Sequence, residues 1–363
     1  MKIVYIIHGL YNSGGMEKIL SEKANVFVSE FGDEVTIITS EQKGRKPFFP
    51  LDSRVKVVDL GVNYHLPRFH RLLRKTLLEL RPDITVSLCG GEMQKLHEIH
   101  DGSAKVAELH FSHKRYFFRR GKGPLHNLVA RSKTRALEHA AARMDAFVVL
   151  TERDRETWVS MVPKLYQIYN FVEIPQGEPS SLNSRHCISV GRLIPSKNFG
   201  EMIQAWQLVA RVHPDWVLDI YGRGSMKKKL LRQIERLGLE GKVLLHDPVS
   251  DVWSRLRESS CFLFTSLNEG MGLALVEAAG AGLPCVSYDI DCGPSEIVED
   301  GVTGYLVSPH DVSAFAQRIC TLIEDEELRT RMGGAALGIC GHFSKETIMP
   351  KWKELFEKCS ISR

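Results

Sequence analysis

Short apolar runs alternate with amphipathic segments along most of this chain. In the first half, KIVYII, EVTIITS and DITVSL are typical of buried strands, and MEKILSEKANVFVSEFG between the first two is typical of a helix. Strands that alternate with helices predict a parallel sheet with helices on both faces. The second half repeats the pattern, from HCISVGR to PCVSYDI. The sequence therefore predicts an α/β protein with two Rossmann-like domains.

The junction between the halves, IYNFVEIPQGEPSSLNSRH, is rich in Pro, Ser, Asn and Gly, which favours a linker. A chain of 363 residues also exceeds what one hydrophobic core usually supports. We therefore expect one domain over residues 1–168, and the linker with a second domain over 169–344. Ligands of doubly wound sheets bind at the carboxyl ends of the strands. Two facing sheets therefore predict a site in an interdomain cleft.

Composition limits the cellular setting. The chain is 43% apolar and 25% charged, which is ordinary for a globular protein. No apolar run approaches the roughly 20 residues of a membrane-spanning helix, and MKIVYIIHG predicts a buried strand rather than a signal peptide. Eight cysteines are scattered without a CxxC pair, which favours reduced thiols. These features predict a cytoplasmic protein.

Positive charge is concentrated in residues 1–170, which carry 27 Lys and Arg against 19 Asp and Glu. Eight of these basic residues lie between Phe111 and Arg135, in a segment without acidic residues. Such a segment favours nucleic acid or an anionic membrane surface. No nucleic-acid-binding motif accompanies it, so we do not expect nucleic acid. The membrane hypothesis would place the protein at the inner face of the plasma membrane, whereas the alternative is a solvated basic helix. The contacts would come from Lys114, Arg115, Arg119 and Arg120.

The stretch GRLIPSKN follows the first predicted strand of the second domain, where a ligand should bind. Arg192 and Lys197 flank a turn that contains Pro195. A guanidinium makes forked contacts with a diphosphate, and an ammonium adds a point charge. The alternative is a basic surface turn before a helix that Ser196 or Asn198 caps.

The stretch EGMGLALVE, from Glu269 to Glu277, follows the strand-like CFLFTS. Gly270 and Gly272 let a ligand approach the backbone, and a helix starting near Leu273 offers amide N–H groups to an anion. Glu277 lies among apolar residues, where a carboxylate needs hydrogen-bond donors. Sugar hydroxyls on both sides of a phosphate would supply them, which is the outline of a nucleotide sugar. The alternative is a structural helix in which Glu277 forms a salt bridge.

Three weaker patterns accompany these stretches. Gly14 and Gly15 open the first predicted helix, in a geometry that suits a phosphate. They form no P-loop, because Met16 stands where Ser or Thr is required, and IYGRGSM is an incomplete nicotinamide fingerprint. His110 ends the strand-like KVAELH, where it faces substrate or serves as a hydrogen-bonded structural residue.

A DxD pattern, Asp289 and Asp291 in YDIDCG, is of the kind that binds Mn²⁺ in another transferase fold. Here it comes late, after the predicted anion-binding helix. We therefore expect no metal at this place.

Together these stretches resemble a retaining glycosyltransferase of the GT-B fold, in family four, within the group 1 glycosyltransferases. The resemblance extends over nearly the whole chain, and its most specific part is GRLIPSKN followed by the E-x7-E pattern of EGMGLALVE. It implies two facing Rossmann-like domains, with a C-terminal helix over about 345–363 that crosses back to the first. It also implies transfer of a hexose or N-acetylhexosamine from a nucleotide diphosphate sugar, most often of UDP, without a metal or other cofactor.

The resemblance implies roles for individual residues. Arg192 and Lys197 would hold the donor diphosphate. Glu277 would bind the ribose, and Gly15 would approach the phosphate from the first domain. Glu269, beside the sugar hydroxyls, and His110, near the reacting sugar, would be catalytic. The remaining donor contacts would come from the backbone of Gly270, Met271, Gly272, Leu273, Tyr221, Gly222, Pro248 and Val249.

Retention without an obvious nucleophile implies attack from the front face, while positive charges stabilise the leaving diphosphate. The acceptor would be a saccharide. The basic segment favours one carried on a polyprenyl diphosphate, in surface polysaccharide or glycan assembly. Two alternatives stay open, namely a nucleotide-sugar epimerase of the same two-domain fold and a non-catalytic nucleotide-sugar-binding protein.

Overall fold

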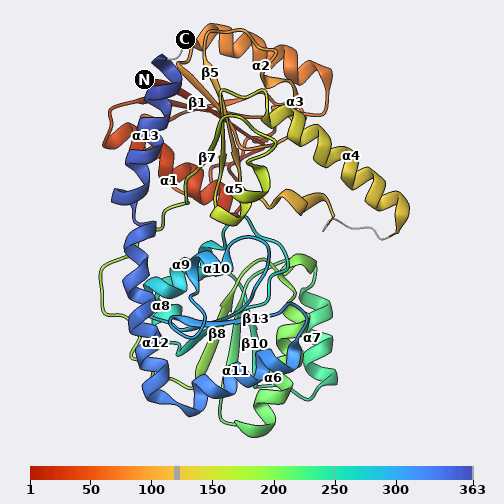
Figure 1. Ribbon diagram of the computed structural model, residues 1–363, viewed down its shortest axis with the longest axis vertical. Coiled ribbons are helices and arrows are strands. Elements are labelled where there is room, and N and C mark those ends of the chain that lie inside the picture. The colour runs from red at the N-terminus through yellow and green to blue at the C-terminus, as the bar shows by residue number, and fades with distance from the viewer. Residues whose placement is uncertain (118–122, 250, 362–363) are drawn as a thin grey trace. The chain divides into compact units, whose positions relative to one another are not determined.

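The computed structural model describes residues 1–117, 123–249 and 251–361. The chain divides into two compact units. Unit 1 comprises Met1–Phe171 and Glu346–Arg363, and unit 2 comprises Val172–Lys345. Each unit is a parallel sheet flanked by helices (Figure 1). This confirms the predicted α/β class with two parallel-sheet domains.

The sheet of unit 1 has the strand order β3-β2-β1-β4-β5-β6-β7, and every described pair is parallel. Ile3 of β1 lies opposite Val35 of β2 on one side and Ile84 of β4 on the other. The strand order therefore reverses between β1 and β4, which is the switch point where doubly wound sheets bind ligands. The strands are β1 (Lys2–Ile7), β2 (Glu34–Thr39), β3 (Lys56–Asp59), β4 (Ile84–Ser87), β5 (Ala104–Leu109), β6 (Ala146–Val149) and β7 (Leu165–Gln167).

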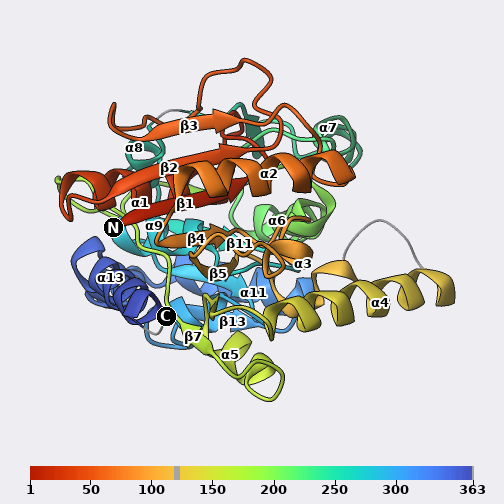
Figure 2. The same cartoon turned by 90° about the horizontal axis from the view of Figure 1, so that it is seen from above.

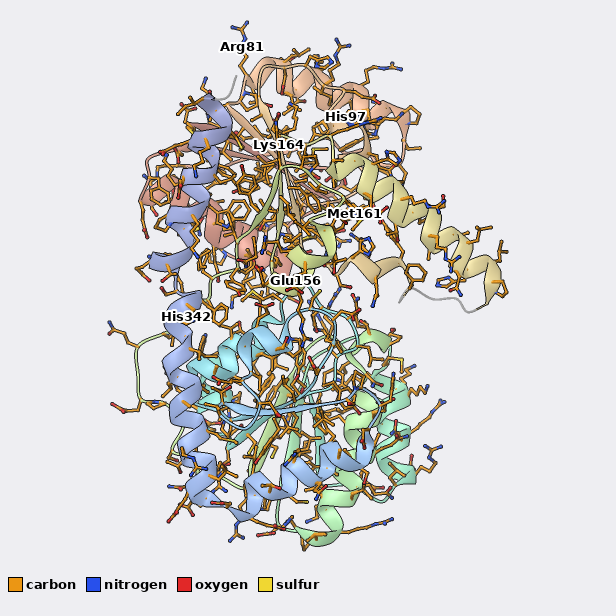
Figure 3. The ribbon with its side chains drawn as sticks, in the orientation of Figure 1. Arg81, His97, Glu156, Met161, Lys164 and His342 are labelled. Atoms are coloured by element: carbon orange, nitrogen blue, oxygen red, sulfur yellow. The ribbon has the colours of Figure 1, made fainter. Side chains whose placement is uncertain are left out.

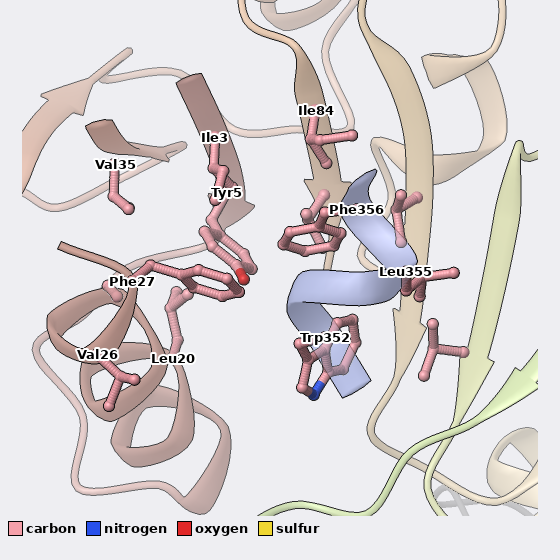
Figure 4. Close-up of a cluster of buried hydrophobic side chains, with 14 of the residues drawn as sticks. Ile3, Tyr5, Leu20, Val26, Phe27, Val35, Ile84, Trp352, Leu355 and Phe356 are labelled. Carbon is pink, nitrogen blue, oxygen red and sulfur yellow. The ribbon is translucent and has the colours of Figure 1, made fainter. Parts of the chain in front are cut away.

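Both faces of this sheet carry apolar cores, because strands such as KIVYII are apolar on both sides. On one face, Phe27 from the first helix stacks on Phe356 from the last helix, with ring centroids 5.3 Å apart (Figure 4). On the other face, Leu96 and Met144 are buried in the second core. Next to Leu96 in the chain is His97, which Figure 3 labels and to which Arg143 donates at 3.3 Å. The helices are α1 (Gly15–Ser29), α2 (Pro67–Leu80), α3 (Met93–Leu96), α4 (Pro124–Ala141), α5 (Glu152–Trp158) and α13 (Lys345–Ile361).

Helix α13 is part of the core of unit 1. Trp352, Leu355 and Phe356 are buried in the same cluster as Ile3 and Tyr5 of β1 (Figure 4). Lys353 is bound to both carboxylate oxygens of Asp33 at 2.9 Å. Apolar packing and an ion pair therefore both hold this helix on the sheet.

The sheet of unit 2 has the order β10-β9-β8-β11-β12-β13, again with parallel pairs. Cys187 of β8 lies opposite Leu218 of β9 and Cys261 of β11, so this sheet reverses between β8 and β11. The strands are β8 (His186–Val190), β9 (Val217–Tyr221), β10 (Val243–His246), β11 (Cys261–Phe264), β12 (Cys285–Tyr288) and β13 (Gly304–Val307). The helices are α6 (Phe199–Val212), α7 (Lys227–Arg236), α8 (Val252–Arg257), α9 (Leu273–Gly280), α10 (Pro294–Ile297), α11 (Val312–Glu324) and α12 (Glu326–Ile339).

Candidate functional site

Two loops meet at the switch point of unit 2, one after β8 and the other after β11. The first passes through a 3₁₀ turn, Pro195–Lys197, and then through Asn198 in a left-handed conformation. The second is hydrogen-bonded to it, because the Leu267 amide donates to the Ser196 carbonyl at 2.8 Å. The Thr265 hydroxyl likewise donates to the Lys197 carbonyl at 3.2 Å. GRLIPSKN and the start of EGMGLALVE are thus parts of one site, at the edge of the sheet where the strand order predicts a ligand.

Lys197 and Glu269 form an ion pair across these two loops, with Lys197 Nζ donating to Glu269 Oε1. Their side chains are only 18% and 13% exposed. Lys197 Nζ also lies 5.5 Å from the centroid of the Phe264 ring, within the range of a cation–π contact. The cation predicted to bind the diphosphate and the carboxylate predicted to bind the sugar are therefore neighbours.

Arg192 lies at the other end of the same turn, and its side chain is exposed. It has no ion pair with any residue in the described part of the chain. The backbone here is fixed, since the Gly191 amide donates to the Tyr221 carbonyl at 3.0 Å. A Cβ on Gly222 would come within 1.9 Å of the Gly191 carbonyl oxygen, so the two loops approach each other as only glycine permits.

The helix that EGMGLALVE predicts near Leu273 is α9. Gly272 precedes it in a left-handed conformation, with φ 92° and ψ 58°. Glu277 lies in the interior of α9 and is 9% exposed, as its apolar neighbours suggested. Neither Ser196 nor Asn198 caps α6 with its side chain. The alternative in which GRLIPSKN serves to cap this helix therefore loses its main support.

A small hollow lies beside Lys197 at the carboxyl ends of β8 and β11. The lining residues are Ser189, Val190, Lys197, Phe199, Met202, Phe264, Thr265 and Ser266.

The residues predicted to meet the base lie at the end of β9 and after β10, two strands that pair with each other. The Tyr221 ring stacks on His246 with centroids 4.4 Å apart, and burial together with Asp219 raises the pKa of Tyr221. Asp219 lies 2.6 Å from both His246 Nε2 and His186 Nδ1. Pro248 and Val249 are exposed. Sequence reasoning missed His246 and Asp219, although a charged residue within the strand-like WVLDIYG was a signal.

In unit 1, Gly15 is the first residue of α1 and Gly14 is its N-cap. The Glu17 side chain folds over this helix start, and a Cβ on Gly14 would come within 2.3 Å of Glu17 Oε2. Asn12 donates to the same carboxylate at 3.3 Å. A carboxylate of the chain itself thus complements the dipole at the place where a phosphate was predicted.

His110 follows the last residue of β5, at the carboxyl edge of the unit 1 sheet. Its Nε2 lies 3.2 Å from Glu108 Oε1, and Lys23 Nζ of α1 donates to Glu108 Oε2 at 2.7 Å. Burial would raise the pKa of Glu108, but the Lys23 ammonium and the neighbouring His110 outweigh it and hold this pKa at about 2. Burial lowers the pKa of Lys23 against the opposing effect of Glu108. Neither Glu108 nor Lys23 was predicted.

The predicted basic surface is only partly described, because Arg119 and Arg120 lie outside the described residues. Lys114 is exposed, whereas the Arg115 guanidinium packs 3.8 Å from the centroid of the Phe111 ring. Helix α4 begins soon afterwards and extends away from the sheet of unit 1 in both views (Figure 2). Its first turns expose apolar side chains: Leu125, Leu128 and Val129.

The DxD residues Asp289 and Asp291 are half-buried and exposed, respectively. Within residues 1–117, 123–249 and 251–361, no group of three or more His, Cys, Asp or Glu is arranged to hold a metal ion. None of the helices in those residues is both long and apolar enough to span a membrane.

Comparison with known proteins shows which family the second unit resembles. Residues 171–337 match the family model of glycosyl transferases group 1. An exopolysaccharide phosphotransferase of Streptomyces coelicolor is 37% identical over 226 residues, which are 60% of this chain but only 24% of that protein. The amylovoran biosynthesis glycosyltransferase AmsD of Erwinia amylovora is 26% identical over 98% of this chain and 99% of its own length.

Among solved structures, a variant of TarM from S. aureus, in complex with fondaparinux, alpha-GlcNAc-glycerol and UDP, superposes with a TM-score of 0.79. It is 20% identical and covers 98% of this chain and 99% of its own. This likeness shows the fold, two parallel-sheet α/β domains. Residues 171–337, most of unit 2, are thus similar to the glycosyl transferases group 1, and the whole chain shares the two-domain α/β fold of TarM, which is the GT-B fold.

Proposed function

We propose that this protein is a glycosyltransferase that moves a hexose or N-acetylhexosamine from a UDP-sugar to a saccharide acceptor, with retention of configuration, in the assembly of surface polysaccharide or glycans. The observation that carries the proposal is the Lys197–Glu269 pair at the switch point of unit 2, just before the α9 N-terminus. It offers a cation for phosphate, a carboxylate for hydroxyls and helix amides for an anion in one place.

The donor would bind across the loops after β8 and β11. Arg192 and Lys197 would contact the diphosphate, Glu269 the sugar hydroxyls, and Glu277 the ribose. TarM, whose fold this chain shares, was solved with UDP, which supports UDP as the nucleotide.

Sugar transfer would be accelerated by stabilisation of the negative charge on the leaving diphosphate. As the glycosidic bond to phosphate breaks, the leaving diphosphate gains negative charge, and Arg192, Lys197 and the α9 amides would stabilise it. We propose that these groups suffice without a metal. The acceptor hydroxyl would then attack from the same face, and His110 of unit 1 would contact the reacting sugar. The TarM complex contains alpha-GlcNAc-glycerol, an alpha-linked sugar, together with UDP, which supports retention.

For the acceptor we propose a saccharide on a polyprenyl diphosphate at an anionic membrane. Exposed Leu125 and Leu128 on α4 follow the basic residues of the preceding segment, a combination typical of interfacial membrane contacts. Neutralising Lys114, Arg115, Arg119 and Arg120 together should remove binding to anionic liposomes. Unchanged liposome binding and unchanged activity on a lipid-linked acceptor would refute this part.

The core proposal is tested in two steps. A thermal-shift panel of nucleotide sugars should show stabilisation by one UDP-sugar, and that donor should then be consumed only with an acceptor. Glu269→Ala and Lys197→Ala should each abolish transfer while circular dichroism shows an intact fold. Full transfer by either variant contradicts the assignment. Conversion of the donor without an acceptor would indicate an epimerase, and binding without turnover a binding protein.

A further inference from the structure

A charged cluster lies inside unit 1, beneath the carboxyl edge of its sheet. Lys23 and Glu108 are each only 1% exposed in their side chains, and they contact each other at 2.7 Å. A buried ion pair costs desolvation energy that its own attraction barely offsets. An ion pair buried under a strand end is therefore expected to have a role beyond stability. The third member of the cluster is His110.

The contact between Glu108 and His110 joins two buried polar atoms for which no other hydrogen-bond partner is described. Glu108 Oε1 and His110 Nε2 lie 3.2 Å apart, both are buried, and neither has a well-aligned hydrogen-bond partner in the described part of the chain. Buried polar atoms are nearly always satisfied. A small rotation of the imidazole would let each atom satisfy the other. Since Lys23 binds only the second carboxylate oxygen, Oε1 remains directed at the histidine.

The rest of the cluster holds this arrangement rigid. Glu108 and His110 are two residues apart, so they point to the same face of β5. On that face, the Trp352 ring of α13 covers Lys23 at 3.3 Å from Nζ to the ring centroid. Glu108 is itself fully buried, so the ion pair is screened from solvent on this side.

We infer that Glu108 is a positioning residue for His110, an inference that rests on the proposed function of His110 beside the reacting sugar. Glu108 holds the proton of the imidazole at Nε2 and fixes the ring plane. Nδ1 therefore carries the lone pair, because the partner of one ring nitrogen decides the state of the other. Lys23 keeps Glu108 ionised so that it accepts and does not donate.

The first test compares Glu108→Gln with Asp33→Asn in transfer assays. Both substitutions remove the carboxylate of a buried ion pair in unit 1, but Asp33 precedes β2 at the opposite edge of the sheet and pairs with Lys353 of α13. We expect E108Q to lower kcat at least about tenfold with little change in donor KM, because a positioned catalytic group contributes ~10²–10⁴-fold. D33N should keep kcat. Equal loss in both variants would overturn the inference.

A double-mutant cycle separates positioning from general damage. If Glu108 acts through His110, E108Q should lower kcat in the wild-type background and have no further effect on His110→Ala. The same fold-loss in both backgrounds would refute the inference.

A third readout needs neither donor nor acceptor. In protein labelled with ¹⁵N-histidine, the ring signals of His110, assigned by their absence in H110A, report which nitrogen carries the proton. We expect an Nε2 proton in wild type and D33N and a changed pattern in E108Q. Unchanged signals in E108Q would overturn the positioning role. If wild type transfers no sugar, the proposed function fails, and this measurement still decides the arrangement of Glu108 and His110.

Discussion

Lys23 of α1 and Trp352 of α13 form a cation–π contact in the core of unit 1, with Nζ 3.3 Å from the ring centroid. Both side chains are fully buried. The Tyr5 ring of β1, which Figure 4 labels together with Trp352, is the next aromatic face, with its centroid 5.8 Å from Lys23 Nζ. Such contacts contribute about 2 kcal/mol when desolvated. Helix α13 thus covers the ion pair beneath His110, and the last helix of the chain supports a candidate catalytic residue of the first unit.

Removing the Trp352 ring should destabilise unit 1 strongly. Trp352→Ala leaves a large cavity and exposes the Lys23–Glu108 pair, so we expect a loss of about 3–5 kcal/mol in the free energy of unfolding. Trp352→Phe keeps an aromatic face and should cost clearly less. Urea denaturation measures both, with Leu125→Ala as a control, since Leu125 is 75% exposed. A cost for Trp352→Ala no larger than that of the control would contradict this packing.

The low pKa of Glu108, about 2 against an ordinary 4.5, predicts a pH dependence of stability. The unfolded chain takes up a proton at Glu108 at higher pH than the folded chain does. Glu108 therefore stabilises the fold above about pH 4.5, and this contribution is lost as the pH falls from there toward 2. The difference in unfolding free energy between wild type and E108Q should shrink steadily below about pH 4.5. An equal difference at neutral and acidic pH would contradict the ion pair.

The exposed Arg192 should matter for the donor and little for stability. A charged hydrogen bond contributes about 1.5–3 kcal/mol, so Arg192→Ala should weaken UDP binding on the order of tenfold to a hundredfold. Arg192→Lys should lie between, because it keeps the charge and loses the forked geometry. Calorimetric titration with UDP measures this. Arg185→Ala, at the other end of β8 in an exposed pair with Asp215, is the matched control and should bind UDP as wild type does.

Local signals located one element of the candidate site. The apolar run after Gly272 predicted the start of α9, because helix starts depend on neighbouring residues. The left-handed conformation of Gly272 was not predicted. Lys197 and Glu269, 72 residues apart in the chain, were assigned to one site through the family resemblance and the rule that ligands bind at the carboxyl ends of parallel strands.

Other features lay beyond the sequence patterns. Glu108 looked like part of a strand, and its partner Lys23 lies 85 residues away on α1. A charge within an apolar strand was the available signal, but no spacing rule links the two. Strand β13 and helices α11 and α12 were not predicted, although Phe315, Ile319 and Leu322 follow a helical period and are buried.

Helix α4 supplies a test of membrane contact that depends on apolar rather than basic residues. Leu125 and Leu128 are 75% and 64% exposed near the start of α4. Replacing both with Asp should abolish co-sedimentation with anionic liposomes, because it removes insertion and adds repulsion. Leu231→Asp on α7 of unit 2, where the leucine is also exposed, should leave sedimentation unchanged. Equal sedimentation of both variants would count against α4 as the membrane contact.

Gly272 should be sensitive to substitution because of its backbone conformation. Its φ of 92° lies where a side chain is strained, so Gly272→Ala should cost about 1–2 kcal/mol of stability. A built Cβ meets only Leu275 Cδ1 at 3.3 Å and Phe264 at 3.6 Å, so the fold should survive while the loop between Glu269 and α9 shifts. UDP affinity should therefore fall together with stability.

Gly334→Ala in the interior of α12 is the matched control, because its Cβ meets nothing within 4 Å. Alanine is the better helix former, so this variant should gain roughly 0.5–1 kcal/mol. Thermal unfolding with and without UDP separates the two substitutions. A Gly272→Ala protein as stable as wild type, with unchanged UDP affinity, would show that the left-handed residue before α9 is dispensable for donor binding.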